Sequence, residues 1–215
     1  MNDLVKNQVS EENPTDNIID RIWTTYKCRY NASHRLLKKN SLQFLSINVI
    51  ALSILALSVL NFGTSKINIE LNNQIDAMLI IFSILSLALS LTVGRSDLKL
   101  ESYKFHECAR QLQGLYDKIK LRKEKDPNYI LSGEEEEYNR ILDKYDINHM
   151  KIDWEQHIFE KPDRYNKTFL QQFFFPILYF FKTRLLYWII IIIPIIGWIF
   201  YIASVFFPFF NSAFI

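Results

Sequence analysis

Three long blocks of apolar residues interrupt an otherwise polar chain. The first covers residues 42–60 and the second covers residues 77–93, and neither contains a charged side chain. At 1.5 Å per residue, each block makes a helix of about 26 to 29 Å, close to the thickness of the hydrocarbon core of a bilayer. Helices buried in soluble proteins rarely stay uncharged on all sides over this length. The pattern therefore predicts a transmembrane hairpin made of these two spans.

The third apolar block, residues 185–207, is the most hydrophobic of the three. It begins with Tyr187 and Trp188, which are typical of an aromatic anchor at headgroup level. Pro194 and Gly197 are expected to bend it, and both are tolerated in lipid. A full crossing would place the C-terminal tail outside the cell, whereas a re-entrant path would return the tail to the cytoplasm. Both paths fit the sequence.

A shorter apolar block, residues 169–181, precedes the third span and is followed by Lys182 and Arg184. It is too short to cross a bilayer. We interpret it as an interfacial helix that lies on the membrane surface. Residues 169–215 therefore combine an interfacial helix with a third membrane segment.

Positive charge is distributed unevenly around the first two spans. Lysines and arginines precede the first span and follow the second, whereas the loop between them has Lys66 as its single cation. Loops rich in Lys and Arg stay on the cytoplasmic side of a membrane. The N-terminus and the region after the second span are therefore predicted to be cytoplasmic.

Amphipathic helices are predicted next to both spans. After a flexible N-terminus, residues 1–15, an apolar face that includes Ile22 and Tyr26 leads into the first span. The second span has no strong breaker at its inner end, so its helix is predicted to continue as a cytoplasmic stalk over residues 94–125. The stalk must pack against something, and the N-terminal amphipathic helix is the obvious candidate.

Asp126-Pro127 is predicted to end the stalk, since a proline disfavours helix at the residue before it. Residues 126–168 form a cytoplasmic helical segment. Within it, a helix is expected over residues 133–145, where four consecutive acids at its start favour a helix N-terminus.

Composition agrees with an all-α membrane protein. The 215 residues include only 5 glycines and 6 prolines, and the net charge is +2. No long stretch alternates in the manner of a strand. Cys28 and Cys108 lie far apart in segments assigned to the cytoplasm, so we expect reduced, buried thiols.

Candidate chemistry is sparse. The sequence has no Gly-rich phosphate loop and no evident nucleophile–base pair, so we expect neither an enzyme nor a cofactor. His149, Asp153 and His157 would share one face of a helix, but eight residues span about 12 Å, too far for all three to bind one ion. We expect polar packing or hydrogen bonds between helices here, and no metal.

The cationic cytoplasmic region has two interpretations. It sets the topology and attracts anionic lipid, or it forms a docking surface for a phosphate-bearing ligand. The candidates for docking are Arg29, Arg35, Lys99, Lys104 and Arg110.

Small polar residues recur at helical spacing on both spans. The candidates are Ser46 and Ser53 on the first span, and Ser83, Ser86 and Ser90 on the second. Such stripes favour close helix packing in lipid, or they line a water-filled centre after several copies assemble. A few serines do not open an aqueous path in a monomer, so a pore requires a homo-oligomer.

The order of these elements resembles the SLATT domain, a two-span effector module of bacterial conflict systems. The resemblance covers residues 18–158, with a core at residues 16–125, and the third apolar block extends beyond it, as in some branches of the family. It is carried by residues 21–37, especially Trp23, Arg29, Ala32 and Arg35, by residues 94–119, and by Tyr138 followed by Asn148-His149 and Asp153.

The resemblance implies an oligomeric effector in the bacterial inner membrane. Such an effector forms a pore or disrupts the membrane on a cytoplasmic signal. It thereby halts the growth of a phage-infected cell, a defence called abortive infection. The implied partner is a separately encoded sensor, such as a nucleotide-second-messenger synthase or a reverse transcriptase, with a nucleotide as a candidate ligand. Trp23, His149 and Asp153 then join the candidate docking residues.

Two other classes compete with this hypothesis. The alternative is a membrane anchor that recruits a cytosolic sensor or enzyme through the stalk. A transporter subunit is disfavoured, because the spans hold no ionisable residue of the kind that marks a substrate or proton pathway.

Overall fold

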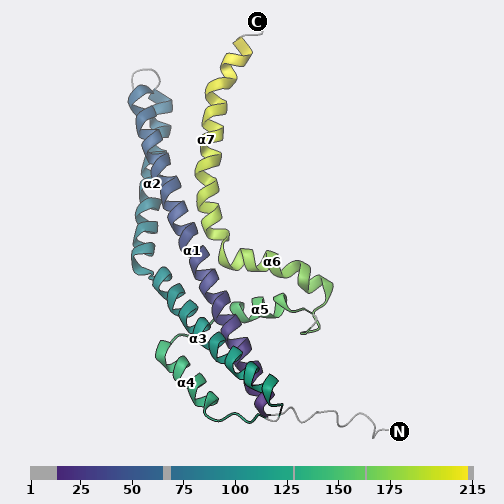
Figure 1. Cartoon of the computed structure of the whole chain (residues 1–215). Coiled ribbons are helices and arrows are strands. Elements are labelled where there is room, and N and C mark those ends of the chain that lie inside the picture. Colours follow the sequence, from purple (N-terminus) through teal and green to yellow (C-terminus); the bar gives the residue numbers. More distant parts are fainter. Residues whose placement is uncertain (1–13, 65–68, 128, 163, 213–215) are drawn as a thin grey trace, which may run out of the picture. The chain divides into compact units, whose positions relative to one another are not determined.

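The computed structural model describes residues 14–64, 69–127, 129–162 and 164–212 (Figure 1). Within these ranges every regular element is an α-helix, as predicted. The helices are α1 (Pro14–Thr64), α2 (Ile69–Arg95), α3 (Leu98–Lys125), α4 (Glu134–Tyr145), α5 (Lys151–Glu160), α6 (Phe169–Thr183) and α7 (Leu185–Ser212). The N-terminus predicted to be flexible lies almost entirely outside the described residues.

The chain divides into two compact units, which we describe separately. The polar unit comprises Met1–Leu36 and Lys99–Phe173, and the apolar unit comprises Leu37–Leu98 and Phe174–Ile215. Helix α1 contributes its first part to the polar unit and its second part to the apolar unit.

The apolar unit contains the predicted hairpin. Two helical stretches are long and apolar enough to cross a membrane, Thr15–Phe62 and Asn72–Lys125, and they contain the two predicted spans. Ile50 and Leu57 of α1 pack with Ile75, Phe82 and Leu89 of α2 in one buried cluster. Their spacing of seven residues is typical of two helices that pack along a common seam. The transmembrane hairpin is thus present as a packed helix pair.

A two-residue interruption separates α2 from α3. Ser96 and Asp97 are not helical, and both the backbone N–H and the hydroxyl of Ser96 donate to the carbonyl oxygen of Val93, at 3.1 and 3.3 Å. Asp97 directly precedes the first residue of α3, where its side chain favours a new helix start. The predicted continuous stalk is therefore a separate helix, which ends at Lys125, directly before Asp126-Pro127 as expected.

The polar unit has a core built from three helices. Ile22 and Tyr26 of α1 meet Leu112 of α3 and Tyr138 of α4 in one buried cluster. The rest of α3's apolar stripe joins them: Cys108, Ala109, Leu115 and Ile119. The structure thus shows the packing of the N-terminal helix on the stalk that the sequence predicted.

Helices α6 and α7 are separated only by Arg184. The stretches Phe169–Thr183 and Leu185–Ile199 meet at 71°, the geometry of a broken span or of a re-entrant loop. No residue of α6 is fully buried, which suits a helix at an interface. Helix α7 continues through Pro194 and Gly197, so the expected bend does not interrupt it.

Candidate functional site

A buried ion pair joins α1 and α5 inside the polar unit. The guanidinium of Arg35 donates to both carboxylate oxygens of Asp153, at 2.7 and 3.0 Å. The Asp153 side chain is fully buried and that of Arg35 is 11% exposed. The same carboxylate accepts the N–H of Met150 at 2.9 Å, and the Asp153 carbonyl accepts the side-chain amide of Asn31. Because Arg–carboxylate pairs of this two-point kind have a fixed geometry, the pair sets the position of α5 on α1.

Arg29, predicted as a docking cation, is also used inside the polar unit. It is 4% exposed, and its guanidinium donates to the carbonyl oxygen of Ile147 at 2.7 Å. The segment between α4 and α5 supplies this acceptor, and the segment's return to α1 could not be seen from helical periodicity.

His149 does not share a helix with Asp153 and His157. Helix α5 begins at Lys151, so the premise of one common helical face is wrong. Burial, with the nearby charge of Arg29, lowers the pKa of His149. Among the described residues, no group of three or more His, Cys, Asp or Glu side chains is placed to hold a metal ion.

His157 lies in an aromatic cluster. Its ring centroid lies 4.7 Å from that of Trp23, 5.6 Å from that of Trp154 and 5.8 Å from that of Tyr165. Its Nε2 is 3.2 Å from the hydroxyl of Tyr165. Burial, reinforced by nearby cations such as Arg164, lowers the pKa of His157 to about 4. The ring is therefore neutral at pH 7 and packs between helices, as the sequence predicted.

The other predicted docking cations face outward from α3. Lys99, Lys104 and Arg110 are exposed, and Arg110 pairs with Glu107 at 2.8 Å. The structure thus does not gather the five cations into one cluster. Two of them hold the polar unit together and three remain on its surface.

The two serine stripes of the apolar unit have different surroundings. Ser46 and Ser53 of α1 are buried, whereas Ser83 and Ser90 of α2 are exposed and Ser86 is half-buried. The hydroxyls of Ser46, Ser53 and Ser83 donate to carbonyls of their own helix, at 2.7 to 2.8 Å. The α1 stripe therefore faces other parts of this chain, and the α2 stripe faces outward at Ser83 and Ser90.

A polar seam between α1 and α7 was missed in the sequence. The side-chain amide of Gln43, 1% exposed, donates to the Tyr187 hydroxyl at 2.9 Å. Further along, the Trp198 indole N–H donates to the Ser53 hydroxyl oxygen at 3.3 Å. Tyr187 is buried and contacts α1, whereas Trp188, the other aromatic residue of the predicted anchor, is 38% exposed. The available signal was Gln43 itself, since an amide within a span needs a partner.

Comparison with known proteins identifies the family. Residues 11–200 match the family described as SMODS and SLOG-associating 2TM effector domain family 5. No curated protein and no solved structure matches the chain. The matched range is wider than the resemblance seen in the sequence and includes the first part of α7, up to residue 200. Together with two candidate spans, this match shows that the chain belongs to the SLATT effector family, in its fifth branch.

Proposed function

We propose that this protein is an oligomeric membrane effector that opens or disrupts the bacterial inner membrane on a cytoplasmic signal, as an abortive-infection defence against phage. The observation that carries the proposal is the outward face of α2. Ile84, Leu87 and Leu91 are each more than 60% exposed, and the exposed Ser83 and Ser90 interrupt this apolar surface. Such a face suits lipid and contacts between copies.

Helix α1 offers a physical route for the signal. It contributes Ile22 and Tyr26 to the core of the polar unit, and Ile50 and Leu57 to the core of the apolar unit. A change in how the polar unit holds α1 therefore acts on the same helix that carries the buried serine stripe. In this proposal, α1 is the shared element through which the signal shifts the protein from a closed state to an open state.

Charge supports the proposed orientation. Cations flank the first two spans on the sides where α1 begins and α3 follows α2, and the positive-inside rule assigns both sides to the cytoplasm. In this proposal the protein acts without catalysis, and the sensor is a separate polypeptide. The family's description as SMODS- and SLOG-associating supports such a partner, and a nucleotide-second-messenger synthase or a reverse transcriptase is the proposed kind.

Membrane depolarisation tests the proposal. The full chain is expressed inducibly in bacteria with its neighbouring genes, the system is triggered, and a potential-sensitive dye is followed. We expect depolarisation with the wild type and a strong reduction with Ser86→Leu, which adds bulk to the α2 stripe. Ser58→Leu is the matched control, because Ser58 is exposed on α1 outside both stripes.

The same experiment separates the alternative. A membrane anchor would co-purify with its cytosolic partner while the triggered cells keep their potential. Unchanged potential in triggered wild-type cells would therefore contradict the effector proposal and favour the anchor. Equal loss of activity in Ser86→Leu and Ser58→Leu would contradict the role of the α2 face.

A further inference from the structure

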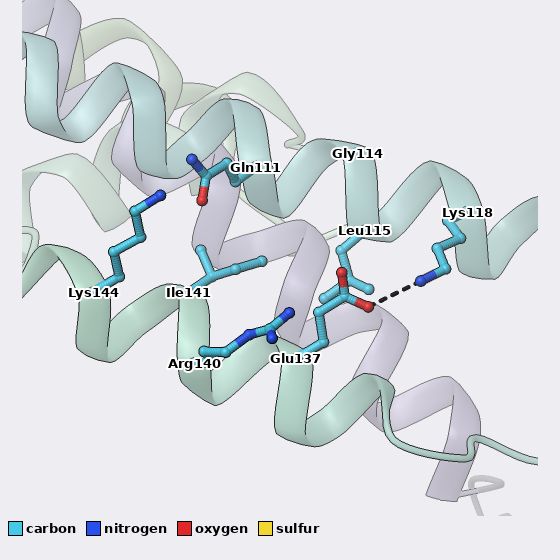
Figure 2. A pocket seen from close by; sticks show the side chains of 8 residues that line it. All are labelled: Gln111, Gly114, Leu115, Lys118, Glu137, Arg140, Ile141 and Lys144. Carbon is cyan, nitrogen blue, oxygen red and sulfur yellow. Dashed lines mark hydrogen bonds and ion pairs between the residues drawn. The ribbon is translucent and has the colours of Figure 1, made fainter.

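A groove of about 380 Å³ lies between α3 and α4 in the polar unit (Figure 2). Its volume lies in the range of small-molecule sites. Leu115 and Ile141 provide apolar side chains, and Lys118, Arg140 and Lys144 provide cations. None of these residues was among the docking candidates predicted from the sequence.

Arg140 differs from the other arginines of the polar unit. Six of the seven have a hydrogen-bond or ion-pair partner: Arg29 a carbonyl oxygen, and Arg21, Arg35, Arg110, Arg122 and Arg164 a carboxylate. Arg140 alone has neither within the described part of the chain, although it lines the groove. An arginine in a concave site without an internal partner is available to an anion.

The remaining charges leave the groove positive. Lys144 is one turn from Arg140 on the same face of α4, and in the described chain it contacts the ring of Tyr145 without forming an ion pair. Lys118 pairs with Glu137 at 2.9 Å, the contact drawn as a dashed line in Figure 2. Three cations and one carboxylate therefore give a net charge of +2 around the groove.

Gly114 leaves part of the α3 wall of the groove without a side chain. Glycine destabilises a helix interior relative to alanine, and it is usually explained there by a close neighbour. At Gly114 an added Cβ would meet no heavy atom within 4 Å. Packing within the chain therefore does not require this glycine, and its missing side chain leaves room for a molecule over α3.

We propose that this groove binds a small organic anion that carries phosphate groups. Arg140 and Lys144 hold the phosphates by charge-assisted hydrogen bonds, and Leu115 and Ile141 contact the apolar part. The lining covers residues 111–118 and 137–144, about 10 Å along each helix. This length suits a molecule of one or two rings and is far short of the 20 to 30 residues a side of a protein interface.

The groove is connected to α1 through α4. The Tyr138 and Thr25 hydroxyls lie 3.1 Å apart, and Arg21 pairs with Glu135 at 2.8 Å. A ligand that draws α3 and α4 together thus acts on the helix that enters the apolar unit. The regulatory role of the groove rests on the proposed function. Ligand binding to the groove does not, because it is measured in an experiment that involves no membrane opening.

Binding to the purified full chain in detergent micelles tests the proposal. The probes are inorganic pyrophosphate, adenosine diphosphate, dihexanoyl phosphatidylglycerol and a hexaglutamate peptide, titrated by calorimetry. We expect saturable binding of adenosine diphosphate that weakens roughly tenfold or more in Arg140→Gln and in Gly114→Leu, which fills the groove. Lys120→Gln is the matched control, because Lys120 is exposed on another face of α3.

Each outcome decides the proposal. Binding of the soluble phosphates assigns a free phosphate compound as the ligand source, and binding of phosphatidylglycerol alone assigns a lipid headgroup. No binding of any phosphate probe at millimolar concentration overturns the site, as does equal weakening in Lys120→Gln. Binding of hexaglutamate alone also overturns it, in favour of an acidic protein segment. Depolarisation without phosphate binding would leave the proposed function standing and remove this site.

Discussion

Arg35 and Asp153 form a two-point ion pair between α1 and α5, across 118 residues of sequence. Arg35 lies directly before Leu36, the last residue that α1 contributes to the polar unit. Buried pairs of this kind contribute little net stability compared with apolar packing, yet removal of one partner leaves an uncompensated charge. The pair therefore fixes how α5 lies on α1 inside the polar unit.

Removal of one partner should strongly destabilise the polar unit. We expect Arg35→Met to lower its free energy of unfolding by about 3 to 5 kcal/mol, because the Asp153 carboxylate stays buried without its cation. Urea unfolding followed by fluorescence of Trp23 and Trp154 measures this. Arg110→Met, which removes an exposed pair, should cost about 1 kcal/mol or less. Similar small losses in both variants would show that the buried pair does not hold α5.

Acid should destabilise the polar unit through His157. Its pKa is about 4 in the folded chain and about 6.5 when unfolded. The folded state resists protonation of His157. The contribution of the neutral ring to the free energy of unfolding is therefore complete above pH 6.5 and is lost as the pH falls toward 4. Between pH 7 and pH 5 the loss is about 2 kcal/mol. Unfolding curves over this range measure it.

His157→Gln should flatten this pH dependence, since the amide does not titrate. His34→Gln is the control because His34 is exposed. This variant should leave the slope of the unfolding free energy against pH unchanged. An unchanged slope in His157→Gln would assign the pH dependence to other groups.

The seam between α1 and α7 should hold the third apolar helix in place. Tyr187→Phe removes the hydroxyl oxygen that accepts the hydrogen bond of the Gln43 side-chain amide. Within the described part of the chain, the Oε1 of Gln43 is already buried without a hydrogen-bond partner. In membranes, hydrogen bonds between helices contribute roughly 0.6 to 2 kcal/mol. We expect Tyr187→Phe to lower the unfolding midpoint of the apolar unit in detergent, measured by circular dichroism.

The exposed residue Leu186 provides the control for this seam. Leu186→Ala should have a small effect, because this side chain is 64% exposed and adjacent to Tyr187. A larger effect at Leu186 than at Tyr187 would indicate that lipid contact, not the α1–α7 hydrogen bond, stabilises the helix.

Both cysteines should be unreactive in the folded protein. Burial raises the pKa of Cys28 to about 12 and also raises that of Cys108. The reactive thiolate is therefore scarce at pH 7.5. A thiol reagent such as DTNB should label neither site until the chain is unfolded, whereas the exposed variant Lys120→Cys should react at once. Labelling of native wild type would show that the polar-unit core opens.

The sequence alone determined the all-helical fold, both membrane spans and some of the helix ends. Uncharged apolar runs have few alternatives to membrane helices, so residues 42–60 and 77–93 identified both spans. Local signals also sufficed at Asp126-Pro127, which ends α3, and at the acidic run that begins α4. The interruption at Ser96 and Asp97 carries only a weak capping signal, and we missed it.

Only the tertiary structure decided what the polar side chains do. Arg29, Arg35 and Arg110 are equivalent as a charge pattern, yet two are internal and one is exposed, because α5 and the segment before it fold back onto α1. Gln43 likewise finds Tyr187, which lies 144 residues later. Periodicity reports which face of a helix is apolar, since that depends on neighbours in sequence. It does not report which distant segment covers that face, since that depends on packing of the whole unit.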